Sequence, residues 1–217
     1  MFAIGLPAGG EMLLLFVYFS AVYWLIQDFG AEAQAGFSIG GRIMQSIFMP
    51  TMAIAFALGP IAGQNFGARR FDRVRETSKK GIILSSIVMA IVTILMQWKS
   101  DLLVGFFTTE LEVIEVGSVF LQLISLNFIA QGIVFSCSGM FQGLGNTRPA
   151  MLSSLIRIIV FLPLAVYLKY QPGFTINQVW YVSILSVTAQ AVVSYLLMRR
   201  EFRLRLGNSD TPNSVSA

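Results

Sequence analysis

Residues 81–98, GIILSSIVMAIVTILMQW, form an apolar stretch without a charged side chain, between Lys80 and Lys99. A helix needs about 20 mostly apolar residues to cross a hydrocarbon core of about 30 Å. The stretch therefore predicts a transmembrane helix. Five other stretches have the same character, so the sequence predicts six spans, at about 4–26, 36–62, 81–98, 113–141, 150–168 and 177–198.

The composition is typical of a membrane protein. Of the 217 residues, 55% are hydrophobic and 12% are charged, whereas soluble domains average about 25% charged residues. Six spans and their connections fill this length. We therefore expect an all-α integral membrane protein with a six-transmembrane-helix bundle over residues 1–206. The polar, turn-forming residues 207–217 are expected to form a disordered cytoplasmic tail.

Several residue types that catalysis commonly uses are missing. The sequence has no histidine and one cysteine, Cys137, which removes the usual zinc ligands and the commonest general base. It also lacks the glycine-rich motif, ending in Gly-Lys-Ser or Gly-Lys-Thr, that holds nucleotide phosphates. We therefore expect no enzymatic activity, no bound metal or cofactor, and no nucleic-acid partner.

Positive charge is concentrated in alternate connections. Of the fifteen Lys and Arg residues, eleven fall within 69–80, 143–149 and 199–205, after the second, fourth and sixth spans. Cations gather on the cytoplasmic side of membrane proteins, so we expect both termini in the cytoplasm and the protein in the plasma (inner) membrane. Trp24, Trp98 and Trp180 fall at the opposite ends of their spans, where amphipathic rings suit the headgroup layer.

Three charged residues lie more than one helical turn inside the predicted spans: Glu11, Arg42 and Arg157. A charge at the bilayer centre costs about 2.5–3.5 kcal/mol on insertion scales, so each should face a cavity or a partner. Counted along the helix rise, Glu11 and Arg157 lie about 10–12 Å from the cytoplasmic starts of their spans and can meet. Arg42 enters from the outer side and can snorkel. Glu11 is a proton or cation site, half of a structural ion pair, or a residue that snorkels inward.

Two spans carry stripes that are candidates for lining a substrate cavity. A step of about 100° per residue places Asn127, Gln131, Ser138 and Gln142 on one face of the fourth span. The same step aligns Gln45, Met49, Met52 and Phe56 on the second. Polar stripes either line a solute path or bond neighbouring helices, and Met or aromatic faces either repack around apolar cations or pack within the fold. The resulting substrate-cavity candidates are Gln45, Met49, Met52, Phe56, Asn127, Gln131, Ser138 and Arg157.

Prolines and glycines indicate where helices break or approach closely. Pro50 interrupts the second span, which we expect to end at Gly59-Pro60, and Pro163 interrupts the fifth. Broken spans are typical of transporter sites because freed carbonyl groups can coordinate cations. Glycines spaced by four residues either let helices pack closely or reflect the general abundance of glycine in spans. They are Gly5/Gly9, Gly36/Gly40, Gly59/Gly63/Gly67 and Gly139/Gly143.

Two longer stretches resemble a known family. They are GPIAGQNFGARRFDRVRE at 59–76 and FQGLGNTRPAM at 141–151. Both are similar to segments of the multidrug and toxic compound extrusion (MATE) family, and Gly5-Leu-Pro7 with Glu11 looks like the opening of that family's seventh helix. The resemblance implies a twelve-helix antiporter of two six-helix lobes that exchanges Na⁺ or H⁺ for organic cations or drugs. This chain resembles the C-terminal six-helix lobe.

The resemblance also implies a coupling residue and a missing partner. Glu11 matches an acidic position found in some members, whereas Gln131 stands where many members carry an acid, and a neutral amide cannot carry a coupling proton. A single lobe in the bilayer implies a second six-helix lobe, or another copy of itself, as partner. The alternatives are a non-transporting fragment or assembly partner, and a lipid-linked saccharide flippase. A flippase would need more cavity cations than Arg42 and Arg157.

Overall fold

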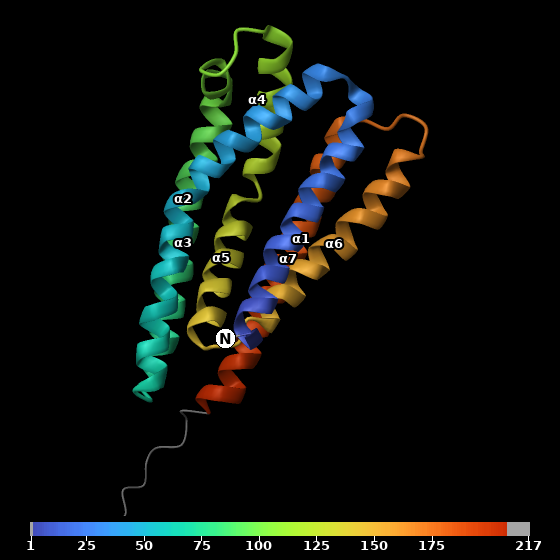
Figure 1. The fold of residues 1–217 in the computed structure, drawn as a ribbon. Helices are drawn as coiled ribbons and strands as arrows, with labels where there is room; N and C mark the ends of the chain where they lie inside the picture. Colours follow the sequence, from blue (N-terminus) through green and yellow to red (C-terminus); the bar gives the residue numbers. More distant parts are fainter. Residues whose placement is uncertain (1, 208–217) are drawn as a thin grey trace, which may run out of the picture.

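The computed structural model describes residues 2–207, and side chains from residue 5 onward. The backbone of this part is helical and contains no strand (Figure 1). Its helices are α1 (Phe2–Ile26), η1 (Gln27–Phe29), α2 (Ala31–Gly67), α3 (Phe71–Gly105), α4 (Leu111–Ser125), α5 (Phe128–Gly143), α6 (Arg148–Lys169) and α7 (Ile176–Leu206). Except for Gly207, the tail expected at 207–217 lies outside the described residues.

The described helices provide six candidate membrane spans. Each of α1, α2, α3, α6 and α7 is long and apolar enough to cross a bilayer. α4 and α5 pass the same test only together, with a bend of 57° between them. The prediction of an all-α six-span bundle is confirmed for this part of the chain. The helix α2 continues to Gly67, past the expected end of the second span at Gly59-Pro60.

The prolines do not break their helices. α2 is continuous through Pro50 and Pro60, and α6 is continuous through Pro163. The expected breaks at Pro50 and Pro163 are therefore wrong. A proline removes only one backbone N–H, and a membrane helix tolerates this where neighbouring groups compensate.

The broken span is the fourth one, which the sequence predicts as a continuous helix over 113–141. At the break, Thr93 Oγ1 donates to the carbonyl oxygen of Ser125 at 2.9 Å. Gln97 Nε2 donates to the carbonyl oxygen of Gln122 at 2.8 Å. The last turn of a helix leaves such carbonyl groups without partners. The two α3 side chains satisfy them, so the chain can bend at the end of α4 without exposing bare carbonyl groups to an apolar environment.

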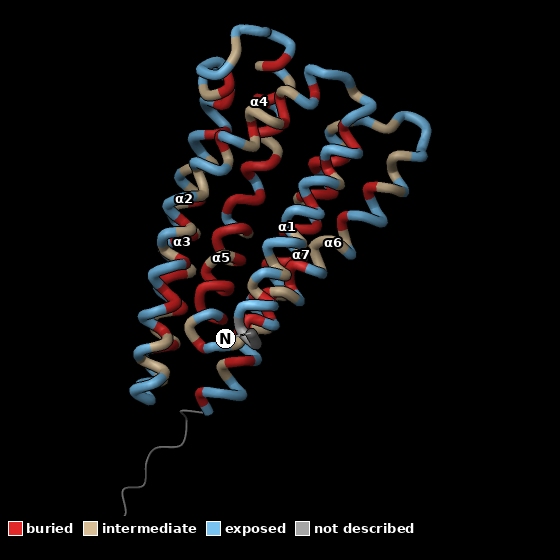
Figure 2. The backbone as a smooth tube through the Cα atoms, viewed as in Figure 1, coloured by how far each residue is buried: buried red, intermediate tan, exposed pale blue. Residues whose placement is uncertain are grey.

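α5 is the central helix of the bundle. It packs against α2, α3 and α7, while α1 packs mainly against α6. Figure 2 shows α5 largely buried and the outward faces of the surrounding helices exposed. On α3 these exposed residues include Ile83, Ile87, Ile91 and Ile94, spaced to form one outward stripe. An apolar exterior of this kind is suited to contact with lipid.

α2 and α5 approach closely at glycines. A Cβ atom added to Gly139 would clash with the carbonyl oxygen of Ala55, and one added to Gly143 would clash with that of Gly59. At Gly9 of α1, by contrast, an added Cβ would meet nothing within 4 Å. Close packing is therefore the role of the glycine spacing along α2 and α5, and Gly9 has no such role within the lobe.

The cation-rich segments lie together at one end of the molecule. Figure 1 shows the start of α1, the α2–α3 and α5–α6 connections and the end of α7 at the same end. Trp24 and Trp98 are exposed, but Trp180 is only 2% exposed and stacks on Phe37, with 5.6 Å between the ring centroids. The expectation of three headgroup-layer tryptophans therefore fails for Trp180, which is a core residue.

The stretch 141–151 is tied to the end of α7. Asn146 Nδ2 donates to Glu201, and Glu201 also forms an ion pair with Arg205 at 3.1 Å. Arg205 donates in turn to the carbonyl oxygen of Leu144 at 2.8 Å. This network holds the turn between α5 and α6 against α7, so that both helices reach the bundle interior at fixed positions.

Candidate functional site

A small cavity with both apolar and polar side chains in its lining lies between α1, α5, α6 and α7. Its volume is about 50 Å³, which is enough for a few water molecules. Met12 and Leu15 of α1 lie on its wall and are exposed, so the cavity reaches the surface beside α1. The polar side chains of its lining are Glu11, Tyr18, Gln131, Ser154, Arg157 and Gln190.

Glu11 is held by one hydroxyl group from α5. Ser138 Oγ donates to the carboxylate and lies 3.0 Å from Oε2 and 3.3 Å from Oε1. Among the described residues no cation lies within ion-pair distance of this carboxylate. Since a carboxylate offers about four lone-pair positions, Glu11 keeps most of its acceptor capacity for a ligand.

Arg157 of α6 stacks on an aromatic ring. Its guanidinium carbon lies 3.8 Å from the centroid of the Tyr18 ring, and the Tyr18 hydroxyl hydrogen-bonds to Ser183 Oγ at 2.6 Å. The Nε atom of Arg157 is buried and has no hydrogen-bond partner. The ion pair between Glu11 and Arg157, one of the roles considered for Glu11, is thus not formed in this structure.

Two glutamines complete the polar lining. Gln190 of α7 is 3% exposed; its Nε2 donates to Ser154 Oγ at 3.1 Å, while its Oε1 has no partner. Gln131 of α5 is 8% exposed, and its side chain makes no hydrogen bond within the described part of the chain. Unsatisfied buried amide groups cost free energy, and here they face a space that a polar ligand or water can fill.

The site offers few groups for a metal ion. No cluster of three or more His, Cys, Asp or Glu side chains occurs among the residues that the structure describes. A small cation at this position would have one carboxylate, that of Glu11, together with neutral oxygens such as the Ser138 hydroxyl and the Gln131 amide.

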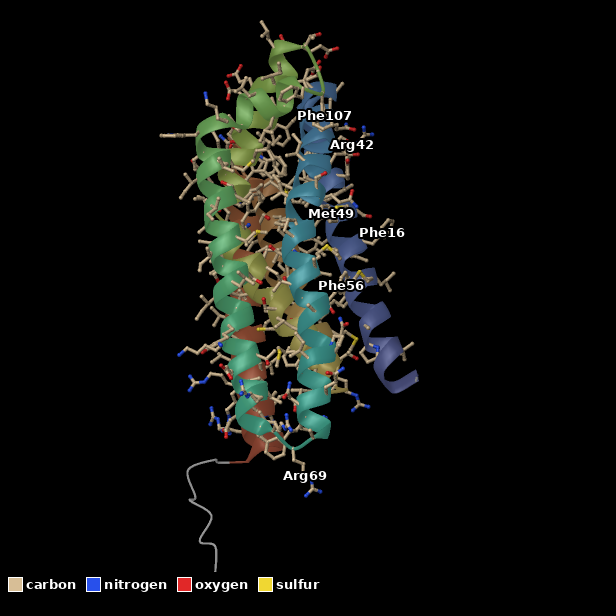
Figure 3. All side chains as sticks on the ribbon, turned by 90° about the vertical axis from the view of Figure 1, so that its left-hand side faces the viewer. Phe16, Arg42, Met49, Phe56, Arg69 and Phe107 are labelled. Atoms are coloured by element: carbon tan, nitrogen blue, oxygen red, sulfur yellow. The ribbon has the colours of Figure 1, made fainter. Side chains whose placement is uncertain are left out.

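The candidate stripe of α2 lies outside this cavity. Met49 and Phe56 are 64% and 63% exposed, Gln45 is also exposed, and Met52 is half-buried. Figure 3 shows Met49 and Phe56 along α2, on the side nearer to α1 in that view. The stripe therefore does share one side of α2, but it does not line a cavity within the lobe.

The fourth-span stripe is divided by the bend. Gln131 lines the cavity and Ser138 binds Glu11, as a shared face predicts. Asn127 lies at the break between α4 and α5, buried, with neither side-chain amide atom bonded, and it is not part of the cavity lining. Gln142 is exposed. The prediction of one shared face holds only for an unbroken helix. The 57° bend between α4 and α5 falls at Asn127 and turns this residue away from that face.

The face formed by α1 and α2 is apolar and uncovered. The two helices diverge from their connection (Figure 1). Phe16 of α1 is 70% exposed, and Figure 3 shows it beyond Met49 and Phe56 of α2. We call the surface made by Phe16, Met49 and Phe56 the α1–α2 face. Met12, on the cavity wall, is exposed beside it.

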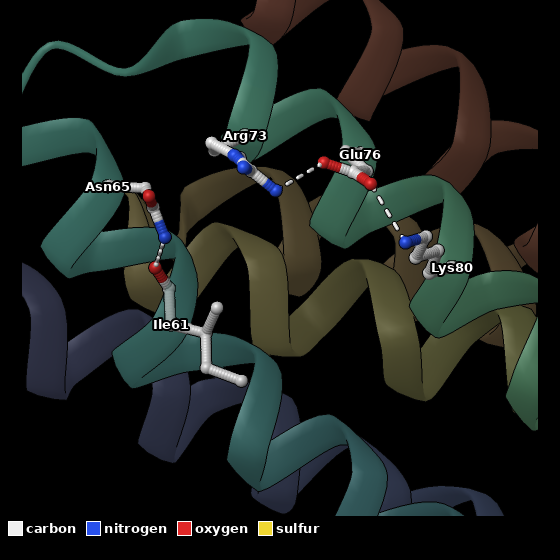
Figure 4. A network of polar contacts seen from close by, with 5 residues as sticks. All are labelled: Ile61, Asn65, Arg73, Glu76 and Lys80. Carbon is white, nitrogen blue, oxygen red and sulfur yellow. Dashed lines mark hydrogen bonds and ion pairs between the residues drawn. The ribbon is translucent and has the colours of Figure 1, made fainter.

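A second, open cavity of about 400 Å³ lies at the α2–α3 connection. Figure 4 shows its polar contacts: Arg73 binds Glu76 at 3.2 Å, Lys80 binds Glu76 at 2.8 Å, and Asn65 Nδ2 donates to the carbonyl oxygen of Ile61 at 2.8 Å. These contacts are exposed. Each of them lies within α2 or within α3, at the cation-rich end, and this cavity is separate from the one that Glu11 lines.

The sequence prediction missed Tyr18, Ser154 and Gln190. Tyr18 follows Glu11 by seven residues, a spacing that returns to the same helix face, and Ser154 precedes Arg157 by three. Gln190 is an amide within an apolar stretch of the last span. Each of these patterns is present in the sequence, but only the packing of the helices shows that the three residues line one cavity.

Comparisons with known proteins agree with this architecture. The MatE family model matches residues 7–167. The probable multidrug resistance protein YoeA of Bacillus subtilis is 25% identical over 178 residues, which cover 82% of this chain and 38% of YoeA. The multidrug export protein MepA of Staphylococcus aureus is 24% identical over 203 residues, covering 92% of this chain and 45% of MepA.

Solved structures show the same fold. A multidrug resistance MATE family transporter in an outward-facing conformation superposes with a TM-score of 0.87 at 17% identity, over 96% of this chain and 47% of the transporter. The chain thus spans less than half the length of the relatives it matches. The match of the family model to most of the sequence, together with the six-span bundle, shows that this chain is an integral membrane protein of the multidrug and toxic compound extrusion (MATE) family.

Proposed function

We propose that this chain is one lobe of a multidrug exporter that exchanges Na⁺ or H⁺ for organic cations across the plasma membrane. The observation that carries the proposal is the position of Glu11, a carboxylate inside a membrane span, bound by one hydroxyl group and not by a cation. A charge inside a bilayer is costly unless it is paired. Binding of a proton or Na⁺ to the carboxylate relieves that cost. A passing organic cation would relieve it as well, so the two ions compete for Glu11.

The substrate surface in this proposal is the α1–α2 face. Its methionine and aromatic side chains adapt to varied apolar shapes, and an aromatic face attracts organic cations. Gln45 and Met52 extend the stripe along α2. The names of the relatives, multidrug resistance and multidrug export proteins, support this substrate class.

A partner lobe covers that face in the working transporter. The chain spans less than half the length of its relatives, and its α1–α2 face carries the methionine and aromatic side chains that the proposed substrates would contact. The partner is a second six-helix lobe, for instance one encoded immediately upstream, or another copy of this chain. In this arrangement the cation-rich end, with both termini, faces the cytoplasm.

Two other functions make different predictions. Because the chain is short relative to its relatives, a non-transporting assembly partner is the main alternative, and it predicts no flux under any condition. A flippase for lipid-linked saccharides requires several cavity cations for a pyrophosphate group. Arg157 is the cation that lines the described cavity, while Arg42 is exposed elsewhere, so the cavity does not favour a flippase.

The test is transport by reconstituted protein. Proteoliposomes are prepared with this chain alone and with the chain co-expressed with the upstream lobe, and ethidium movement is followed under an imposed Na⁺ or pH gradient. The proposal predicts gradient-driven ethidium flux in at least one preparation and none in protein-free liposomes. Flux that is absent from both preparations, despite correct insertion, contradicts it.

A further inference from the structure

Arg157 is a cation in the cavity with hydrogen-bonding capacity to spare. Its guanidinium rests on Tyr18, but a ring face supplies no hydrogen-bond acceptor in the plane of the guanidinium. The buried Nε atom has no partner. No carboxylate pairs with this side chain in the described part of the chain. Arg157 is half-buried, and a partly desolvated cation without an anion costs free energy that an anionic ligand would recover.

The surroundings of Arg157 add neutral donors. Gln131 lines the same cavity, 8% exposed and with its side-chain amide unbonded. Ser154, one helical turn before Arg157 on α6, already accepts a hydrogen bond from Gln190 and retains its own hydroxyl proton to donate. A guanidinium, an amide and a hydroxyl together form a donor set suited to a carboxylate.

Tyr18 holds Arg157 in place for such a ligand. The phenol is fixed by its hydrogen bond to Ser183 and by an edge-to-face contact with Phe161, with 4.8 Å between the ring centroids. A cation held on a fixed ring loses less conformational entropy when a ligand arrives than a free arginine would lose. The guanidinium is therefore prepared for an anion before binding.

We propose that this cavity binds the carboxylate of substrates that carry a carboxylate beside their cationic group, with Arg157 as the residue that selects them. This rests on the proposed function and specifies, within its substrate class, the zwitterions that Arg157 would select. A cavity of about 50 Å³ admits a group of carboxylate size and excludes the body of a drug. The body remains on the α1–α2 face, and the cationic nitrogen lies on the Glu11 side of the opening.

A matched pair of dyes tests the proposal. Rhodamine 110 carries a free carboxylate, and rhodamine 123 is its methyl ester, so the pair differs only at this group. Binding of each dye to the full chain in phosphatidylcholine nanodiscs is measured by fluorescence anisotropy, with protein-free nanodiscs as the blank. Since a charge-assisted hydrogen bond contributes about one to two factors of ten in affinity, we expect rhodamine 110 to bind at least about tenfold more tightly.

Variants identify the residue responsible. Arg157→Gln should reduce the affinity ratio of the two dyes to about one, with little change for rhodamine 123. Arg157→Lys keeps the charge but loses the planar fork, and should give an intermediate ratio. Arg148→Gln removes an exposed charge from the start of the same helix and should leave the ratio unchanged. Size-exclusion elution shows which variants fold.

The outcomes separate this inference from the proposed function. Equal binding of both dyes to the wild-type chain overturns the inference while leaving organic-cation export intact, whether or not any variant folds. If folded Arg157→Gln protein still prefers rhodamine 110 as strongly as the wild type does, the inference is also overturned. If neither dye binds, the inference fails, and the ethidium flux decides the proposed function independently.

Discussion

Glu11 and Arg157 carry opposite charges in one cavity, and each is bound by a neutral neighbour instead of by the other. Ser138 holds the carboxylate, and Tyr18 holds the guanidinium. A direct ion pair would use the acceptor capacity of one and the donor capacity of the other, leaving little for ligands. Separate neutral partners keep both groups in position and available for exchange, which is what a transport site requires.

The lack of an ion pair makes a prediction for stability. Because neither residue is the ion-pair partner of the other, we expect the double variant Glu11→Gln/Arg157→Gln to be no more stable than the less stable of the two single variants. Thermal unfolding in detergent of the wild type and three variants measures this. A double variant that regains the stability lost by each single one would instead show that the two charges are paired.

The sequence allowed part of this site to be predicted. The fixed rise of a helix places Glu11 and Arg157 at matching depths, and both do line one cavity. Depth does not determine how each helix is rotated in the bundle. For that reason Tyr18 and Gln190 were missed, and Met49 and Phe56 were assigned to a cavity when they lie on an exposed face.

Among the helices, the α2–α5 pair depends on glycine most directly. Gly139 and Gly143 let the two backbones approach so closely that a methyl group has no room. Close approach of helices is a main source of stability in membranes, where burial of apolar surface contributes little. Because α5 carries Gln131 and Ser138 and is central to the lobe, the spacing of this pair also sets the position of the cavity wall.

We expect Gly139→Ala to destabilise the lobe by about 1–3 kcal/mol, the usual cost of overpacking a core. The matched control is Gly9→Ala in α1, where the added methyl group meets nothing within 4 Å. The control should unfold at the wild-type temperature or slightly above it. Thermal unfolding followed by circular dichroism compares the two. Equal midpoints for both variants would show that the close approach of α2 and α5 contributes nothing to stability.

Helix boundaries were harder to predict than helix number. Apolar stretches identify six spans, but α2, α3 and α7 continue past these stretches into segments that carry charged residues. The bend between α4 and α5 was not predicted either. It depends on Thr93 and Gln97, which are distant in sequence and supply hydrogen bonds to the end of α4. Such tertiary compensation leaves no local pattern in the bent segment itself.

For the whole molecule, the charge distribution defines two ends. The cation-rich connections lie together (Figure 1), and we expect that end to face the cytoplasm. Cysteines introduced at Ala68 and at Thr109, both exposed, should react with a membrane-impermeant maleimide from opposite sides. Cys137 is fully buried, and changing it to serine removes any background. Labelling of both positions from the same side, or of Ala68→Cys only from outside, would contradict this topology.

At the same scale, the surface that we propose for substrates is uncovered in the lobe. Phe16 of the α1–α2 face follows Met12, on the cavity wall, by one helical turn, so a partner lobe on that face would enclose both in one chamber. In that chamber an organic cation and the coupling ion are both close to Glu11. Exchange of one for the other is then a competition for a single carboxylate, driven by whichever ion gradient is imposed.

Coupling through Glu11 is tested most directly by ethidium flux in proteoliposomes containing the transporting assembly, with the Glu11→Gln variant compared with the wild type. The control is Glu32→Gln, which removes an exposed carboxylate from the first turn of α2. Since a neutral amide cannot exchange a proton or hold Na⁺ as a carboxylate does, Glu11→Gln should insert normally but lose gradient-driven flux, and Glu32→Gln should retain it. Wild-type flux in well-inserted Glu11→Gln protein would contradict the coupling role.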